Sequence, residues 1–466
     1  MEATEKVAVI GAGAAGLAAA RQLALEGFEP VIFEAESRLG GTWVYTEELE
    51  SDPLGRDPDR YRVHTSMYAD LRTNLPRDLM AFREFPFDVP GGGEERMPER
   101  HDEGLRFPPH ADVLRYLERY AERFHLVDRI RFQCRVENLV PLDASGNVWT
   151  DRGDRADGGD EPASWRISVT DASGARRDEE FRAVAIGNGH YAFPRVPELP
   201  GAGLFKASQL HSHSYRHPDK YRDQKVVLLG ARASGIDIAF EIGKCAREVY
   251  LCARGVEQQQ PLFGRDNISL SPPITSLEGG ATAVLSGEGR IEDIDTLIYC
   301  TGYEYRLPFL DPAGVASPVV TVEDNWIHPL FLDLLAARAP SLGLIGLGNH
   351  IVPFPQYELQ AKFYAAMLAG RIALPDRAER ERLAGARAAE QRAAGVAQRH
   401  FLQQGDAQFA YNDELARRSG VEPLPPSFKE VYKAVEQARF RDPETYREED
   451  FPWVDRSGSA GAELRR

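Results

Sequence analysis

Three glycines near the N-terminus have the spacing of a phosphate-binding turn. Gly11, Gly13 and Gly16 come directly after the apolar run 7–10 and at the start of an Ala/Leu-rich run that extends to residue 25. This order predicts strand, turn and helix: the first glycine makes the turn, the second lets the backbone approach a pyrophosphate, and the third lets the helix pack closely on the strand. Free N–H groups at a helix N-terminus attract an anion. The predicted phosphate contacts are Gly11, Gly13, Ala14, Ala15 and Gly16.

An acidic residue follows where a dinucleotide site requires one. A second predicted strand covers 31–33, and Glu34 stands at its end, where a carboxylate accepts hydrogen bonds from a ribose diol. Glycine-rich turns are also common in purely structural roles. The order of strand, helix and terminal acid favours the nucleotide site over that alternative.

The same pattern returns in the middle of the chain with two differences. A predicted strand at 225–229 leads into a turn, a helix at 236–245 and a second strand at 249–253. Arg232 replaces the middle glycine, and an arginine can contact phosphate through its side chain. Arg254 replaces the terminal acid, where a cation accommodates the 2′-phosphate of NADPH; a solvated surface arginine is the alternative. The predicted NADPH contacts are Arg232, Ala233, Ser234, Gly235 and Arg254.

The residues that follow Glu34 indicate which dinucleotide the first site binds. A simple NAD dehydrogenase has no need for the run Arg38-Leu39-Gly40-Gly41-Thr42-Trp43, whereas many FAD enzymes carry such a segment near the flavin. Together with the glycine turn, this run resembles the FAD-binding opening of the flavin-containing monooxygenases. The resemblance implies FAD contacts at Arg38, Leu39, Gly41, Thr42 and Trp43.

The next segment, residues 64–87, interleaves polar residues with aromatic ones. From the residues alone, core packing around a helix explains it as well as an active site does. Its M-Y-x-x-L-R-T-N-L-P-R pattern is similar to the active-site segment of the plant and insect monooxygenases that oxygenate sulfides or alkaloid nitrogens. The resemblance implies that Asn74 is the active-site asparagine. It also implies FAD contacts at His64, Thr65 and Met67.

Further stretches extend the resemblance along the chain. Residues 205–215 resemble the family's F-x-G-x-x-x-H-x-x-x-F/Y fingerprint, with Ala207 in place of the glycine, and His211 is expected to couple the domains rather than to transfer a proton. Residues 295–303 resemble the D-x-V-x-x-A-T-G-Y segment that leads back to the flavin domain, and 441–447 resemble the tail of sulfide-oxygenating relatives. These stretches and two isolated positions add NADPH contacts at Thr301 and Gly302, and FAD contacts at Val136 and Gln356. A plain strand at Val136 and a helix cap at Gln356 are the alternatives.

Length and charge limit the kind of partner. At 466 residues the chain exceeds one ordinary domain. A net charge of -16 argues against a nucleic acid or an anionic membrane. We find no signal peptide and no run of about 18 apolar residues, so we expect a soluble cytoplasmic protein. The four cysteines have neither C-x-x-C nor zinc spacing, so we expect no metal and no redox disulfide.

These patterns predict an α/β fold with two Rossmann-like dinucleotide-binding domains. The NADPH domain, residues 191–302, is expected to be inserted into a discontinuous FAD domain, 1–190 and 303–466. Outside the motifs, we expect an amphipathic helix at 111–124, a strand at 130–139 and a charged helix at 376–403.

The resemblance implies a flavin-dependent monooxygenase with FAD and NADPH as cofactors. NADPH reduces FAD, dioxygen adds to give a flavin C4a-hydroperoxide, and one oxygen passes to a soft nucleophile, the nitrogen of an amine or the sulfur of a sulfide. Dimers are common in the family, so a homodimer is the assembly that the resemblance suggests.

Three other functions are alternatives to this one. A Baeyer–Villiger monooxygenase shares both motifs, but its fingerprint usually ends in tryptophan, where this chain has Tyr215. A disulfide reductase needs a cysteine pair beside the flavin, which is absent. A non-catalytic FAD/NADPH sensor needs only the binding motifs, and the sequence leaves it open.

Overall fold

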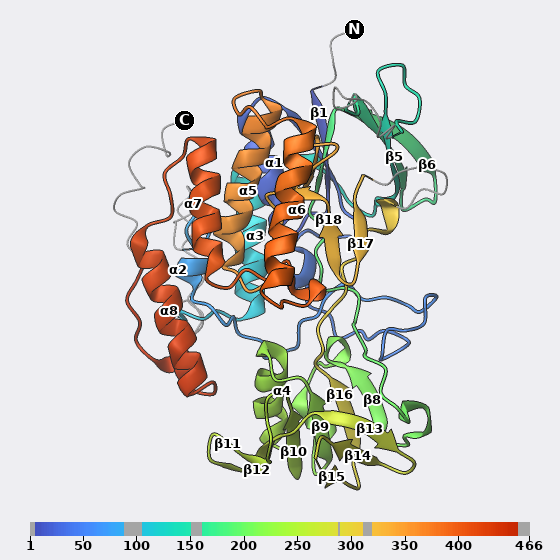
Figure 1. Cartoon of the computed structure of the whole chain (residues 1–466), viewed down its shortest axis with the longest axis vertical. Helices are drawn as coiled ribbons and strands as arrows, with labels where there is room; N and C mark the ends of the chain where they lie inside the picture. The colour runs from blue at the N-terminus through green and yellow to red at the C-terminus, as the bar shows by residue number, and fades with distance from the viewer. Residues whose placement is uncertain (1–4, 88–104, 151–160, 288, 311–318, 455–466) are drawn as a thin grey trace.

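The computed structural model describes residues 5–87, 105–150, 161–287, 289–310 and 319–454. Two largely parallel sheets lie at opposite ends of its long axis (Figure 1). The upper sheet carries most of the helices, and the lower one is formed by the middle of the chain. These two sheets give the α/β class that the sequence predicts.

The upper sheet has seven strands in the order β19-β20-β21-β7-β1-β2-β3. Strand β1 lies inside this sheet, parallel to β2 on one side and to β7 on the other. Apolar side chains fill both faces of β1, as expected for a parallel strand covered on two sides. The strands are β1 (Lys6–Ile10), β2 (Glu29–Phe33), β3 (Ile130–Arg131), β7 (Ala183–Ile186), β19 (Leu330–Phe331), β20 (Leu335–Ala336) and β21 (Leu342–Leu344).

The lower sheet has six strands in the order β11-β12-β10-β9-β16-β8. Here β9 is the central strand, parallel to β10 and to β16. The strands are β8 (Ser208–His211), β9 (Lys225–Leu229), β10 (Glu248–Cys252), β11 (Gln260–Leu262), β12 (Arg265–Ser271) and β16 (Thr296–Tyr299). Helix α4 (Ala233–Gly243) connects β9 to β10, which repeats the β1-α1-β2 unit of the upper sheet.

The remaining strands form smaller antiparallel sheets. The alternating burial along β5 shows that one of its faces packs on the core. The strand predicted at 130–139 is divided into β3 and β4, because Gln133 adopts a positive φ of 50° that interrupts the extended backbone. These strands are β4 (Arg135–Leu142), β5 (Ser164–Thr170), β6 (Arg176–Phe181), β13 (Ile274–Glu278), β14 (Thr282–Leu285), β15 (Arg290–Ile291), β17 (Thr321–Glu323) and β18 (Trp326–His328).

Helices cover the upper sheet, where α1 packs against α5, and α5 against α7. The helix predicted at 376–403 ends at Ala393, since Gly395 has a φ of 74° and the chain turns there. None of the helices among the described residues is long and apolar enough to cross a membrane. The helices are α1 (Ala14–Leu25), α2 (Arg77–Met80), α3 (His110–Arg123), α5 (Pro353–Leu368), α6 (Arg377–Ala393), α7 (Ala407–Ser419) and α8 (Pro426–Arg441). Short 3-10 turns used below are η1 (Gly41–Trp43), η7 (Gln398–His400) and η8 (Tyr446–Glu448).

Two extended segments connect the halves of the molecule. The chain runs down through residues 193–195 and returns through 301–304. The two segments pair antiparallel: the Arg195 N–H donates to the Gly302 carbonyl at 2.9 Å, and the Glu304 N–H donates to the Phe193 carbonyl at 2.8 Å. The chain therefore enters and leaves the lower half through adjacent backbone.

Candidate functional site

Gly11 and Gly16 are required by the packing of the first turn. Gly11 has a φ of 97°, and a Cβ there would lie 2.7 Å from the carbonyl oxygen of Gly187, at the end of β7. A Cβ on Gly16 would overlap the Gly11 carbonyl oxygen. Any side chain at these two positions therefore separates the strand, the turn and the start of α1.

Gly13 is different, because the protein leaves room beside it. A Cβ on Gly13 would come no closer than 3.6 Å to a described atom, the Cα of Gly41. No side chain of the described residues caps α1, and its first turn holds no acidic residue. The first N–H groups of α1 thus remain available to an anion, as a pyrophosphate site requires.

The 38–43 segment lies directly on this turn. The Gly40 N–H donates to the Ala12 carbonyl at 3.0 Å. Gly40 has a φ of 120°, and a Cβ on it would clash with Leu114 of α3. The glycine pair thus lets η1 and α3 close on the phosphate-binding turn.

Glu34 holds the turn from the other side. One carboxylate oxygen accepts the Ala12 N–H at 2.7 Å, and the other accepts the Glu36 N–H at 2.8 Å. Burial raises the pKa of this carboxyl, and the two backbone N–H groups oppose that rise. Each oxygen keeps a lone pair that a ribose hydroxyl can use.

Residues 64–67 join the same site through Thr42. The Thr65 hydroxyl donates to the Thr42 carbonyl at 2.7 Å and accepts the Met67 N–H at 3.2 Å. Beside them, burial lowers the pKa of His64. The Trp43 ring lies edge-on to Phe354, with the ring centroids 6.4 Å apart. The structure therefore brings η1 and this segment together.

Asn74 is half-buried, and its side chain makes no hydrogen bond to any described residue. The backbone around it is fixed: the Thr73 N–H donates to the Pro108 carbonyl at 2.9 Å, and the Thr73 hydroxyl donates to the Leu75 carbonyl at 2.8 Å. Pro108 lies two residues before α3, whose Leu114 packs on Gly40. A side-chain amide on a fixed backbone, with no partner among the described residues, is suited to a ligand.

Several residues predicted to contact FAD have partners within the protein. Arg38 pairs with Glu118 of α3 at 3.0 Å and is 57% exposed, and the Leu39 side chain lies in the core. Gln356 lies in α5, two residues after Phe354, which packs on Trp43. Its side chain is fully buried, and its Nε2 donates to Gln404 at 2.8 Å and to Asn412 at 3.1 Å. Val136 lies near Glu34, whose carbonyl accepts the Cys134 N–H at 2.8 Å.

The second turn repeats the geometry of the first. Gly230 has a φ of 113°, and a Cβ on Gly235 would overlap its carbonyl oxygen. A Cβ on Gly230 would overlap the Cys300 carbonyl oxygen, just as Gly11 meets Gly187. No described side chain caps α4, whose exposed Ala233 and Ser234 begin the helix.

Two arginines give this turn a positive charge. Arg232 is the N-cap of α4 and lies against His350, and Arg254 follows β10. Partial burial lowers the pKa of Arg232, and the neighbouring charge of Arg254 lowers it further. The same two charges add to burial and Arg399 in lowering the pKa of His400 in η7. An anion bound between these cations would relieve their repulsion.

The fingerprint residues are buried at the junction of the two halves. His211 is inaccessible to solvent, its Nδ1 accepts the His213 N–H at 3.1 Å, and burial lowers its pKa to about 3. The Tyr215 hydroxyl donates to Glu241 of α4 at 2.7 Å. Thr301 and Gly302 both bond to the Arg195 backbone. These four residues connect elements of the junction.

Gly187 and Gly346 are not among the predicted contacts, yet both pack on the first turn, Gly187 from the end of β7 and Gly346 from the loop after β21. A Cβ on Gly187 would lie 2.9 Å from the Gly16 nitrogen, and one on Gly346 would lie 3.2 Å from the Ala15 Cβ. A glycine just after an apolar strand was the available signal for both.

The family model described as flavin-binding monooxygenase-like matches residues 4–258 and 264–431. The chain belongs to this family. Members of the family are enzymes that use FAD and NADPH. The two turns are the sites that fit these cofactors, because each presents an uncapped helix N-terminus and glycines that the packing requires.

Among its relatives are two flavin-containing monooxygenases of Arabidopsis thaliana. FMO GS-OX-like 4 is 39% identical over 95% of this chain and 93% of its own, and FMO GS-OX5 is 39% identical over 90% and 85%. The solved structure of S-allyl-L-cysteine S-oxygenase from Allium sativum matches with a TM-score of 0.84 and 36% identity, over 95% of both chains. A cyclohexanone monooxygenase, with a TM-score of 0.58 and 14% identity, shares the fold alone.

Proposed function

We propose that this monooxygenase uses NADPH and dioxygen to transfer one oxygen atom to the sulfur of a small sulfide. The observation that carries the proposal is the likeness to the S-allyl-L-cysteine S-oxygenase, which extends over 95% of both chains. When bound and reduced, FAD supplies the chemistry that activates dioxygen.

The chain's own residues hold the two cofactors in this proposal. The uncapped start of α1 and the space beside Gly13 receive the FAD pyrophosphate, and Glu34 accepts from the ribose. The start of α4 and the Arg232 side chain receive the NADPH pyrophosphate, while Arg254 contacts the 2′-phosphate.

Asn74 is the proposed active-site amide. Its side chain has no partner among the described residues, and the backbone on both sides of it is hydrogen-bonded. A fixed donor loses little entropy when it binds, and it keeps its direction while the reaction proceeds. We assign it to orienting the oxygen atom and the bound nicotinamide in a site with little water.

Replacing Asn74 tests this role. In Asn74→Ala and Asn74→Leu, NADPH should still bleach the flavin under anaerobic conditions, since hydride transfer depends on stacking of the two rings. Oxygen transfer should slow by on the order of 10²–10³, the typical effect of one lost donor, with hydrogen peroxide released instead of product. The control is Asn147→Ala in an exposed turn. If the Asn74 variants form product and consume NADPH in the parent ratio, the residue only packs.

A substrate panel tests the choice of sulfur. An S-alkyl cysteine, a tertiary amine and a cyclic ketone are each supplied with NADPH and air, and product is measured per NADPH consumed. We expect the sulfide to give the highest ratio. A higher ratio with the amine or the ketone would replace the sulfide assignment, and no product with any of them would favour a binding function.

A further inference from the structure

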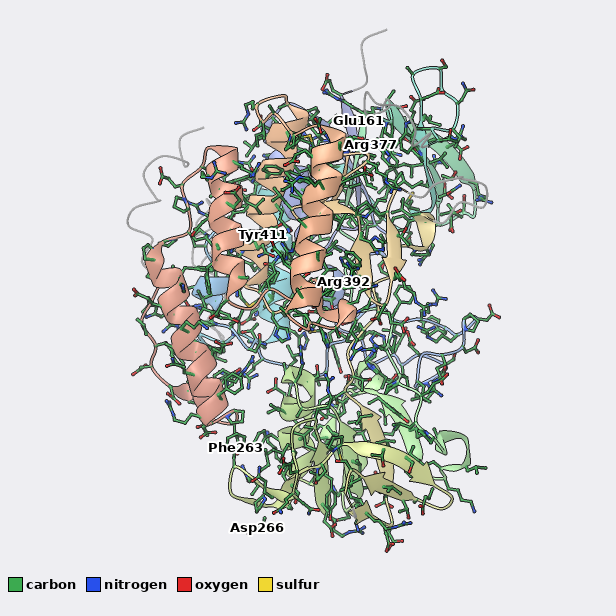
Figure 2. All side chains as sticks on the ribbon, viewed as in Figure 1. Glu161, Phe263, Asp266, Arg377, Arg392 and Tyr411 are labelled. Atoms are coloured by element: carbon green, nitrogen blue, oxygen red, sulfur yellow. The ribbon has the colours of Figure 1, made fainter. Side chains whose placement is uncertain are left out.

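The C-terminal strap, residues 442–449, connects the active-site segment to the NADPH-binding half. It follows α8 and includes η8. Figure 2 labels Phe263 and Asp266 on the β11–β12 hairpin, which lies beside the end of α8. Arg265 of that hairpin pairs with Glu444 of the strap, and Glu448 pairs with Arg72 at 2.6 Å. The strap thus contacts both halves of the molecule.

Arg447 makes the central connection of the strap. Its Nε donates to the Thr73 carbonyl at 3.0 Å, and its Nη2 donates to an Asp237 carboxylate oxygen at 3.1 Å. The side chains of Arg447 and Asp237 are only 12% and 20% exposed, so water competes weakly for these bonds. One guanidinium therefore bonds a backbone carbonyl in one half and a carboxylate in the other.

Both partners of Arg447 adjoin the proposed chemistry. The Thr73 carbonyl belongs to the peptide that joins Thr73 to Asn74, so a bond to it fixes the plane from which the Asn74 side chain leaves the backbone. Asp237 lies in the first turns of α4, whose N-terminus is the proposed NADPH site. Tyr68, from the active-site segment, also reaches Asp237, at 3.5 Å.

We propose that Arg447 is a positioning residue that fixes Asn74 relative to the NADPH-binding helix and so keeps NADPH consumption coupled to oxygen transfer. The inference rests on the proposed function of Asn74 and deepens it. Arg447 contacts neither cofactor in this scheme. It acts through the 73–74 peptide and through α4.

The test compares Arg447→Gln, Asp237→Asn and the double variant. Because a misplacement of about 1 Å can cost on the order of 10²-fold in rate, we expect Arg447→Gln to lower product per NADPH by about tenfold or more. FAD content and anaerobic bleaching by NADPH should persist. The double variant should be no worse than Arg447→Gln alone, because both changes remove the same connection. Arg447→Lys, which keeps the charge, should restore part of the coupling.

A second readout does not depend on activity. Hydrogen–deuterium exchange should become faster in Arg447→Gln at residues 70–76 and in the first turn of α4, but unchanged in α1. The matched control is Arg441→Gln, which removes an arginine that pairs within the same region, with Glu449, and is 65% exposed. It should leave both coupling and exchange at the parent values.

Each outcome decides the inference. Faster exchange at 70–76 together with loss of coupling supports it. It is overturned if Arg447→Gln lowers melting temperature and turnover while product per NADPH stays at the parent ratio, or if Arg441→Gln uncouples equally. If Asn74→Ala uncouples while Arg447→Gln does not, only the role of Arg447 fails; if Asn74→Ala stays coupled, the proposed function of Asn74 fails first.

Discussion

Replacing Gly13 by alanine separates cofactor binding from folding in the first turn. The Gly13 backbone, with a φ of -79° and a ψ of -176°, is open to any residue, and a Cβ there meets no described atom closer than 3.6 Å. A glycine-to-alanine change at such a site stabilises by roughly 0.4–1 kcal/mol through the unfolded chain. Alanine is a poorer N-cap than glycine, with an opposing effect of about the same size. The apoprotein should therefore keep its stability to within about 1 kcal/mol.

FAD binding should respond differently. The new methyl group projects where the pyrophosphate approaches the backbone, and it lengthens N–H bonds to a charged group that are each worth about 1.5–3 kcal/mol. Loss of one such bond lowers the affinity for FAD by about 10- to 150-fold. The assay is a titration of apoprotein with FAD, followed by flavin fluorescence, with thermal unfolding of the apoprotein measured in parallel.

A matched variant three residues away provides the contrast. In Gly16→Ala the new Cβ overlaps the Gly11 carbonyl oxygen, so the apoprotein itself should be strongly destabilised or insoluble. Gly13→Ala protein that binds FAD as tightly as the parent would refute the placement of the pyrophosphate. If the Gly13→Ala apoprotein is as unstable as Gly16→Ala, the conclusion that the protein leaves room for a side chain at Gly13 is wrong.

Two further predictions concern charge. Arg254→Ala should weaken NADPH binding by about ten- to a hundredfold and leave NADH binding nearly unchanged, because only NADPH carries the 2′-phosphate. If binding titrations show equal weakening for both cofactors, Arg254 has a structural role instead. For His211, the unfolded chain takes up a proton below pH 6.5, whereas burial delays protonation in the folded protein to about pH 3. Stability is therefore full above pH 6.5 and falls as the pH drops towards 3. His211→Asn, which keeps an acceptor for the His213 N–H, should reduce that slope by up to about 1.4 kcal/mol per pH unit, and an unchanged slope in urea titrations would exclude His211 as its source.

The two dinucleotide units were predictable because their determinants are local. Gly11 and Gly16 meet each other across one turn, and Glu34 reaches back to the same turn at Ala12. The boundaries of their strands and helices differ from expectation by only a few residues. Spacing alone encodes this geometry, so the sequence predicts it.

Contacts between distant segments were not predictable in the same way. The Arg447 bond to the Thr73 carbonyl joins residues 374 positions apart, and no local sequence pattern predicts it. Gln356 shows another limit: most of α5 is buried, so no polar stripe indicates that this side chain bonds to Gln404 and Asn412. The break at Gln133 arises because one residue adopts a positive φ, which the apolar pattern does not reveal.

The two antiparallel segments that connect the halves, 193–195 and 301–304, bear on how this protein could be re-engineered. Since Pro194 and Tyr303 pair between these segments, the ends of the six-stranded half lie next to each other. Such a half can be cut out as one cassette and replaced by another whose ends are equally close, without rerouting the host chain. The same geometry explains how a nucleotide-binding module can enter a pre-existing domain during evolution by a single insertion into one loop. If the proposed sites hold, chimeras that exchange residues 196–300 between relatives would inherit the nicotinamide cofactor preference of the donor and keep the oxygenation site of the host.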